Sequence, residues 1–158
     1  MEKLVISKHT RKWCLYPYLG HPSGCPNYDK KKCLLTTPLI DSYLDLNSPL
    51  YAVYSEFNLE EHIRRLKRKH PNWSERQLKC VLYWQGSSRK MLRENISKAQ
   101  SKFLFTKIIT CPEWLGVNVY ATLKLAGLYL DKIKSLKICR HVAICGVERG
   151  HITQRRLF

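Results

Sequence analysis

Apolar and polar positions follow two different periods along the second two thirds of the chain. Residues 50–57 (LYAVYSEF) are β-branched and aromatic with partial alternation, which is typical of a strand. Residues 103–110 and 136–145 have the same character, and in the last segment Leu136, Ile138, Val142 and Ile144 share one face. The pattern therefore predicts three strands.

Two capping signals mark the starts of helices between these strands. Asn58 is followed three positions later by Glu61, which predicts a helix from there to about residue 69. Ser74 and Gln77 repeat the signal and predict a long helix over residues 75–99, bent near Gly86. Its apolar positions on or near one face are Leu78, Leu82, Leu92 and Ile96.

A third helix is expected between the second and third strands. Pro112 suits the first helical turn, and Gly127 suits the position just after the last one. The order strand, helix, helix, strand, helix, strand predicts a small α/β or α+β domain. We expect a sheet of three to five strands with about three helices against it.

The length of 158 residues is that of one ordinary domain, so we expect one unit over residues 1–158. Within it, residues 1–49 are a long cysteine-rich loop region and residues 50–146 are the α/β core. Residues 147–158 form a basic tail, which carries Arg155 and Arg156.

The cysteine-rich region contains the clearest chemical signal. Residues 13–33 run WCLYPYLGHPSGCPNYDKKKC, and their prolines and glycines predict a loop without helix or central strand. The segment nevertheless carries Cys14, Cys25 and Cys33 beside Trp and Tyr. A loop of this composition usually wraps a ligand, and three thiols favour a metal ion or an iron–sulfur cluster.

The spacing of the cysteines bears on which metal they would hold. Ten residues separate Cys14 from Cys25, and seven separate Cys25 from Cys33. Structural zinc sites usually pair ligands about two to four residues apart, whereas iron–sulfur clusters tolerate wider spacings. Cys25 and Cys111 both precede proline, as ligands of such clusters often do, so Cys111 is the expected fourth ligand. The spacing leaves open whether the metal is an iron–sulfur cluster or zinc, and whether three or four cysteines bind it.

Three blocks of the chain resemble a family of small cysteine-rich proteins described as predicted metal-binding proteins, whose reaction is not assigned. The blocks are residues 13–33, residues 70–94 (HPNWSERQLKCVLYWQGSSRKMLRE), and TCPEWLGVNVYATLKLAGLYL running on to RHVAICG, residues 110–146. The resemblance implies a bound metal, a 4Fe–4S cluster above all, on Cys14, Cys25, Cys33 and Cys111. The chain departs from the family at Leu34, where prolines are usual, and at Trp114, where a small residue is usual.

The other three cysteines gain nothing from the resemblance. Cys80, Cys139 and Cys145 are expected to be packing residues. Seven cysteines without a signal peptide indicate reduced thiols or ligands in the cytoplasm, and no segment has the apolar length of a membrane span.

The charge suggests a partner. Lys and Arg number 28 against 12 Asp and Glu, a formal net charge of +16 at pH 7, and the densest basic patch is residues 62–70. Such a surface attracts RNA, DNA or another polyanion. The sequence thus predicts a cluster-dependent redox or sulfur-handling protein with a polyanion-binding surface. It identifies neither a redox partner nor a reaction. The alternative is a zinc-stabilised nucleic-acid-binding module without a reaction.

Overall fold

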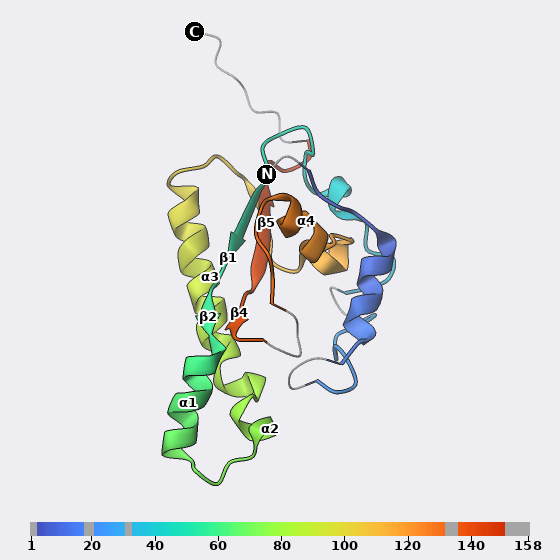
Figure 1. Ribbon diagram of the computed structural model, residues 1–158. Coiled ribbons are helices and arrows are strands. Elements are labelled where there is room, and N and C mark those ends of the chain that lie inside the picture. The colour runs from blue at the N-terminus through green and yellow to red at the C-terminus, as the bar shows by residue number, and fades with distance from the viewer. Residues whose placement is uncertain (1–2, 18–20, 31–32, 132–135, 151–158) are drawn as a thin grey trace.

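A three-stranded antiparallel sheet organises the protein (Figure 1). The computed structural model describes residues 3–17, 21–30, 33–131 and 136–150. The strands of this sheet, in spatial order, are β1 (Tyr51–Tyr54), β5 (Val142–Gly146) and β3 (Lys107–Ile109). Every residue of the central strand β5 is buried, as expected for an apolar strand that is covered on both faces.

A second, two-stranded sheet continues the first. It pairs β2 (Phe57–Asn58) with β4 (Ile138–Cys139). The expected strands 50–57 and 136–145 are each interrupted, at Ser55–Glu56 and at Arg140–His141. One side-chain and one backbone hydrogen bond hold the interruption. The amide of His141 donates to Oγ of Ser55 (3.0 Å), and the amide of Ser55 donates to the carbonyl of His141 (3.0 Å).

Four α-helices and several short 3₁₀ helices surround the sheets. The α-helices described are α1 (Leu59–Lys69), α2 (Glu75–Leu78), α3 (Gln85–Gln100) and α4 (Val119–Leu125). The 3₁₀ helices described are η1 (Lys8–Leu15), η2 (Ile40–Ser42), η3 (Val81–Tyr83) and η4 (Pro112–Leu115). Together with the sheets, they confirm a small mixed α/β fold.

Both predicted caps are confirmed. Oδ1 of Asn58 accepts a hydrogen bond from the amide of Glu61 (2.9 Å) at the start of α1. Ser74 and Gln77 form a complete capping box at the start of α2. Caps are local, so sequence spacing alone places them correctly.

The long helix predicted over 75–99 is wrong. The chain leaves the helix after Leu78, passes through η3 and restarts as α3. The reason is Trp84, which is buried and packs with Leu59, Val81 and Cys139. Its Nε1 also donates to the carbonyl of Lys79 (3.2 Å), so burying the indole takes precedence over continuing the helix.

The single helix expected between Pro112 and Gly127 is also two elements. Gly116, at φ +86°, ends η4, and Oδ1 of Asn118 accepts from the amide of Ala121 (2.9 Å) to cap α4. A Cβ at Gly116 would lie 2.7 Å from Cδ2 of Leu39, so the tight turn lets the chain pass close to that side chain.

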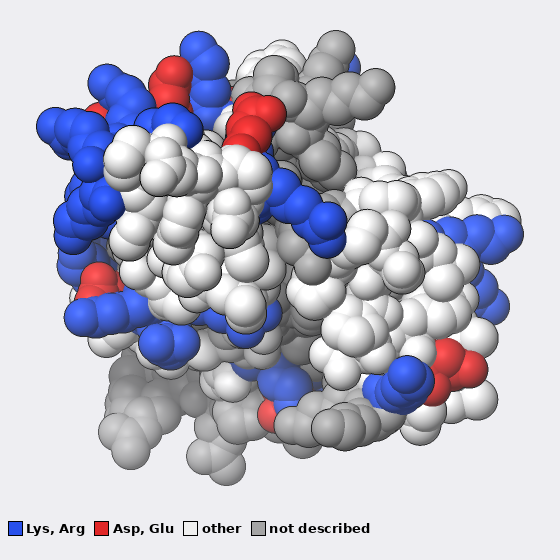
Figure 2. Space-filling view, turned by 90° about the horizontal axis from the view of Figure 1, so that it is seen from below, with Lys and Arg blue, Asp and Glu red and all other residues white. Residues whose placement is uncertain are grey.

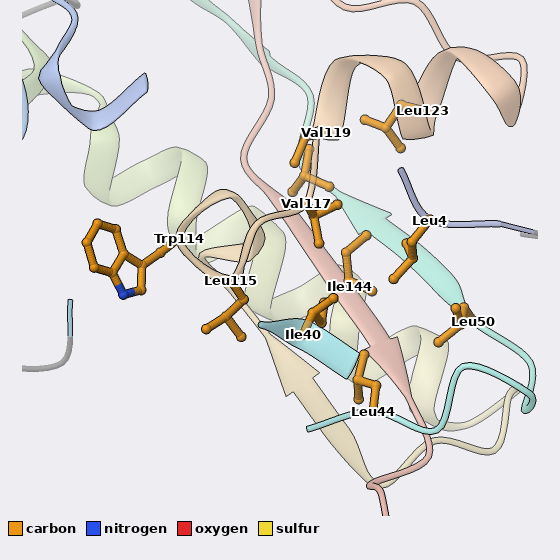
Figure 3. Close-up of a cluster of buried hydrophobic side chains, with 11 residues drawn as sticks. Leu4, Ile40, Leu44, Leu50, Trp114, Leu115, Val117, Val119, Leu123 and Ile144 are labelled. Carbon is orange, nitrogen blue, oxygen red and sulfur yellow. The ribbon is translucent and has the colours of Figure 1, made fainter. Parts of the chain in front are cut away.

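The main sheet lies between two apolar clusters. On one face α3 contributes Leu92 and Ile96, which pack with Val53, Ala143 and Cys145. On the other face the N-terminal segment, η2, η4 and α4 meet around Ile144 (Figure 3). The residues labelled there are Leu4, Ile40, Leu44, Leu50, Trp114, Leu115, Val117, Val119, Leu123 and Ile144.

The second cluster brings the N-terminal segment beside η4. The amide of Ser7 donates to the carbonyl of Gly116 (2.7 Å), and the amide of Asn118 donates to that of Val5 (2.8 Å). In the part of the chain that the structure describes, no helix is long and apolar enough to cross a bilayer. Residues 151–158 of the expected basic tail lie outside the described residues.

Candidate metal centre

Cys14 lies in a helix that the sequence did not predict. Residues 13–15 form the end of η1, which begins where Oγ of Ser7 accepts from the amide of His9 (3.2 Å). The first proline of the cysteine-rich segment is Pro17, two residues beyond this helix. The expectation of a loop without helix is therefore wrong for its first three residues, because no breaker precedes Pro17.

Cys25 is bonded to the backbone of Cys14. Its amide donates to the carbonyl of Cys14 at 2.6 Å, which folds the loop back on the end of η1. Gly24 permits this approach, because its φ is +81° and a Cβ there would lie 2.6 Å from the same carbonyl oxygen. Further along, the amide of Cys33 donates to the carbonyl of Lys30 (2.9 Å).

Cys111 is distant in sequence from the other three candidate ligands. It follows β3 by two residues and is the N-cap of η4, with Pro112 in the first helical position. That start to the helix confirms the role predicted for Pro112.

Arg11 holds the two halves of this region together. Its side chain is buried, and its Nε donates to the carbonyl of Trp114 (2.7 Å). Its other nitrogens donate to the carbonyls of Leu35 (2.9 Å), Pro38 (3.0 Å) and Thr37. One guanidinium therefore joins η1, η4 and the segment that follows Cys33. Sequence analysis missed it, because a lone arginine in a basic run gives no signal.

Two aromatic rings close the same junction. Tyr28, three residues after Cys25, meets the indole of Trp114 edge-on, with ring centroids 5.8 Å apart. The guanidinium of Arg11 lies 5.4 Å from the centre of the same indole. Nε1 of Trp114 is buried, and no acceptor for it is found among the described residues.

The pKa of Cys111 responds to the charges of the other three thiols. Burial raises the pKa of Cys111 to about 12, and the charges of Glu113, Cys33, Cys14 and Cys25 add to the effect in that order. Burial likewise raises the pKa of Cys14 to about 11, with contributions from Cys25, Glu113 and Cys33. The fold thus brings all four predicted ligands into one electrostatic neighbourhood.

The same neighbourhood is not a closed site for a single ion. Within the described ranges, no three His, Cys, Asp or Glu side chains lie close enough to hold one metal ion. Cys14, Cys25 and Cys33 are half-buried, and no disulfide joins the four cysteines. Cys111 as a whole residue is exposed, although the surrounding protein desolvates its thiol.

Glu113 adds a carboxyl group to the thiols. Burial raises its pKa, and its charge in turn raises the pKa of Cys14, Cys111 and Tyr120. Among the described residues, every contribution to the pKa of Cys111 raises it, and no cationic side chain lowers it.

The remaining cysteines lie elsewhere. Cys145 packs against α3 and Cys139 packs with Trp84, and burial raises the pKa of each to about 11. Cys80 is the N-cap of η3. Neither buried thiol contributes to the pKa of Cys111, although the charge of Cys139, like that of Glu113, raises the pKa of Tyr120.

A search for similar proteins finds no matching family profile, no matching curated protein and no matching solved structure.

Proposed function

We propose that the protein binds a metal centre through Cys14, Cys25, Cys33 and Cys111, and that the centre is a 4Fe–4S cluster. The supporting observation is that the charges of Cys14, Cys25 and Cys33 all raise the pKa of Cys111 across the η1–η4 junction. Without a cation, burial, Glu113 and the other thiols all oppose the thiolate form of Cys111. A bound metal supplies the missing positive charge, and coordination removes the thiol protons.

The spacing of the cysteines along the chain supports a cluster over zinc. A single zinc ion needs its ligands within about 2.3 Å of one point, and structural zinc sites usually pair ligands about two to four residues apart. A cluster binds each thiolate at a different iron, so it tolerates ligands that are farther apart. The ten residues between Cys14 and Cys25 and the seven between Cys25 and Cys33 suit the second arrangement.

The proposed role is redox or sulfur handling in the reducing cytoplasm, with the basic surface contacting RNA or another polyanion. A bound cluster supplies one-electron transfer. The chain's own residues would set its environment. Arg11 fixes the η1–η4 distance, and burial raises the pKa of the Glu113 carboxyl beside the thiols. The alternative is a zinc-stabilised module without a reaction, and metal analysis distinguishes it from a cluster protein.

The test is metal analysis of anaerobically purified or reconstituted protein, together with acid-labile sulfide and an absorption spectrum. A cluster gives iron and sulfide in equal amounts and a broad band near about 400 nm. Colourless protein with one equivalent of zinc supports the alternative, since zinc has a filled d shell. Protein with neither metal overturns the proposal.

The ligands are assigned by single substitutions. Cys14→Ser, Cys25→Ser, Cys33→Ser and Cys111→Ser are expected to lower the metal content sharply. Cys80→Ser is the matched control, because Cys80 is also half-buried but lies outside the neighbourhood, and its metal content should be unchanged. Retention of a full cluster in Cys111→Ser alone would reduce the ligand set to three.

A further inference from the structure

Three rings stack where α1 turns into α2. The ring centroids of His70 and Trp73 are 4.0 Å apart with planes 9° from parallel, and Trp73 and Tyr83 follow at 5.1 Å and 30°. The stack is not part of the core, since Tyr83 is 50% exposed and its neighbour Leu82 is 84% exposed. Tyr83 thus presents ring surface to solvent.

The backbone that carries the stack is fixed before any ligand arrives. Nζ of Lys67 donates to the carbonyls of Pro71 (2.6 Å) and Trp73 (3.2 Å), and the amide of Trp73 donates to the carbonyl of His70 (3.0 Å). The capping box of Ser74 then closes the turn. A ligand that stacks on these rings therefore pays little for ordering them.

The stack stands in the most basic part of the molecule. Residues 59–79 carry seven Lys or Arg against three Glu. Figure 2, which looks onto the α1 and α2 end, shows Lys and Arg gathered along one side of an uncharged surface.

Several of these cations have no carboxylate partner. Glu61 pairs with Arg64 and Arg68, and Glu75 pairs with Lys79. No ion pair within the described residues involves the other four cations, namely Arg65, Lys67, Lys69 and Arg76. The surface therefore combines positive charge that no carboxylate neutralises with the exposed ring of Tyr83.

We propose that this surface binds single-stranded nucleic acid, with a base stacked on the His70–Trp73–Tyr83 rings and phosphates beside the cations of α1 and α2. The inference rests on the polyanion-binding part of the proposed function and not on the metal centre. The phosphates of a nucleic acid would neutralise the cations of this surface, and an unpaired base would stack on its exposed rings. A duplex or a sulfated polysaccharide supplies only the negative charge, because neither offers the face of an unpaired base.

The first test uses the unaltered protein and fluorescence anisotropy. A labelled oligothymidylate is compared with an abasic oligomer of the same length and charge, with a duplex and with heparin. We expect the oligothymidylate to bind at least about ten-fold more tightly than the abasic oligomer, the value of roughly one stacked base. Equal affinities for the two oligomers overturn the stacking inference but leave polyanion binding in place. Absence of binding to every probe at low salt overturns both.

The second test uses substitutions with matched controls. Tyr83→Leu should weaken oligothymidylate binding about ten-fold and leave heparin binding and the salt dependence unchanged. Tyr129→Leu is the control, because Tyr129 is 69% exposed but lies beyond α4, away from the stack. An unchanged affinity in Tyr83→Leu overturns the inference.

The charge is tested separately from the rings. In the double substitution of Lys69 and Arg76 by Gln, the slope of log affinity against log salt should fall by about 0.7 for each lost phosphate contact. Base-bearing and abasic oligomers should lose affinity alike. An unchanged slope shows that phosphates do not lie beside these cations and overturns the proposed placement. Metal content, measured in each variant, should equal that of the unaltered protein.

Discussion

The amide of Cys25 donates a hydrogen bond of 2.6 Å to the carbonyl oxygen of Cys14. Two candidate ligands with ten residues between them are thereby joined through the backbone. The contact requires Gly24, whose φ of +81° turns the chain and whose missing Cβ leaves room for that carbonyl.

Gly24→Ala should therefore destabilise the loop by more than its backbone angle alone explains. The positive φ costs a residue with a Cβ about 1 kcal/mol, and the 2.6 Å approach to the Cys14 carbonyl adds to this. Gly127→Ala is the matched control, with φ +80° and nothing within 4 Å of the added carbon. The free energy of urea unfolding and the metal content are measured for both variants. Equal losses of unfolding free energy would show that the loop accommodates the added Cβ at Gly24 without further cost.

Arg11→Lys should loosen the junction between η1 and η4. Lysine cannot reproduce the planar fork, so the buried carbonyl of Trp114 and the partly buried carbonyls beyond Cys33 lose their donors, a cost of about 2 kcal/mol or more. Arg149→Lys is the control, since Arg149 is exposed and donates one hydrogen bond, to Asp41. Its free energy of unfolding should change by less than about 0.5 kcal/mol. Similar effects in both variants would contradict the role given to Arg11.

Ser88→Ala should break the polar network that fixes the interrupted strands. Oγ of Ser88 lies 2.9 Å from Oγ of Ser55 and 2.8 Å from Nδ1 of His141, and both serines are fully buried. Leaving these partners without Ser88 should cost about 1–2 kcal/mol in urea unfolding. Ser87→Ala, on the exposed neighbour in the same helix, should be neutral within about 0.5 kcal/mol. A neutral Ser88→Ala would mean that backbone bonds alone hold the interruption.

Stability should fall as the pH drops below neutrality. Burial lowers the pKa of His62 and His141 below 6.5, and the charges of Arg65 and Arg89 lower them further. The unfolded chain takes up protons near 6.5, before the folded protein does. The stabilising effect of the neutral rings is therefore complete above that pH and is lost as the pH falls toward the lower folded values. Urea unfolding between about pH 8 and pH 5 measures it.

His62→Phe tests the source of this dependence. Nε2 of His62 is buried and finds no partner among the described residues, and the ring packs 5.4 Å from that of Phe57. Phenylalanine keeps the ring contact and cannot be protonated, so the pH dependence should flatten. His9→Phe, at an exposed position, should leave the dependence unchanged. Parallel curves for His62→Phe and the unaltered protein would assign the dependence to other groups.

The signals that the sequence interprets correctly act over a few residues. Asn58 and Ser74 accept hydrogen bonds from amides three positions ahead, and Pro112 occupies a first helical turn, so spacing alone determines them. The apolar segments 103–110 and 136–145 likewise contain the strands that build the sheet. Local chemistry therefore determined the fold class and the places where α1, α2 and η4 begin.

Only the tertiary structure decided where the elements break and which distant groups meet. Residues 75–99 have a helical pattern, but burying Trp84 against Leu59 stabilises the fold more than an unbroken helix would. Cys111 joins the thiols of the N-terminal loop because Arg11 satisfies carbonyls from two separate segments at once. Such a contact depends on desolvation at one point in space, and neither periodicity nor spacing along the chain records it.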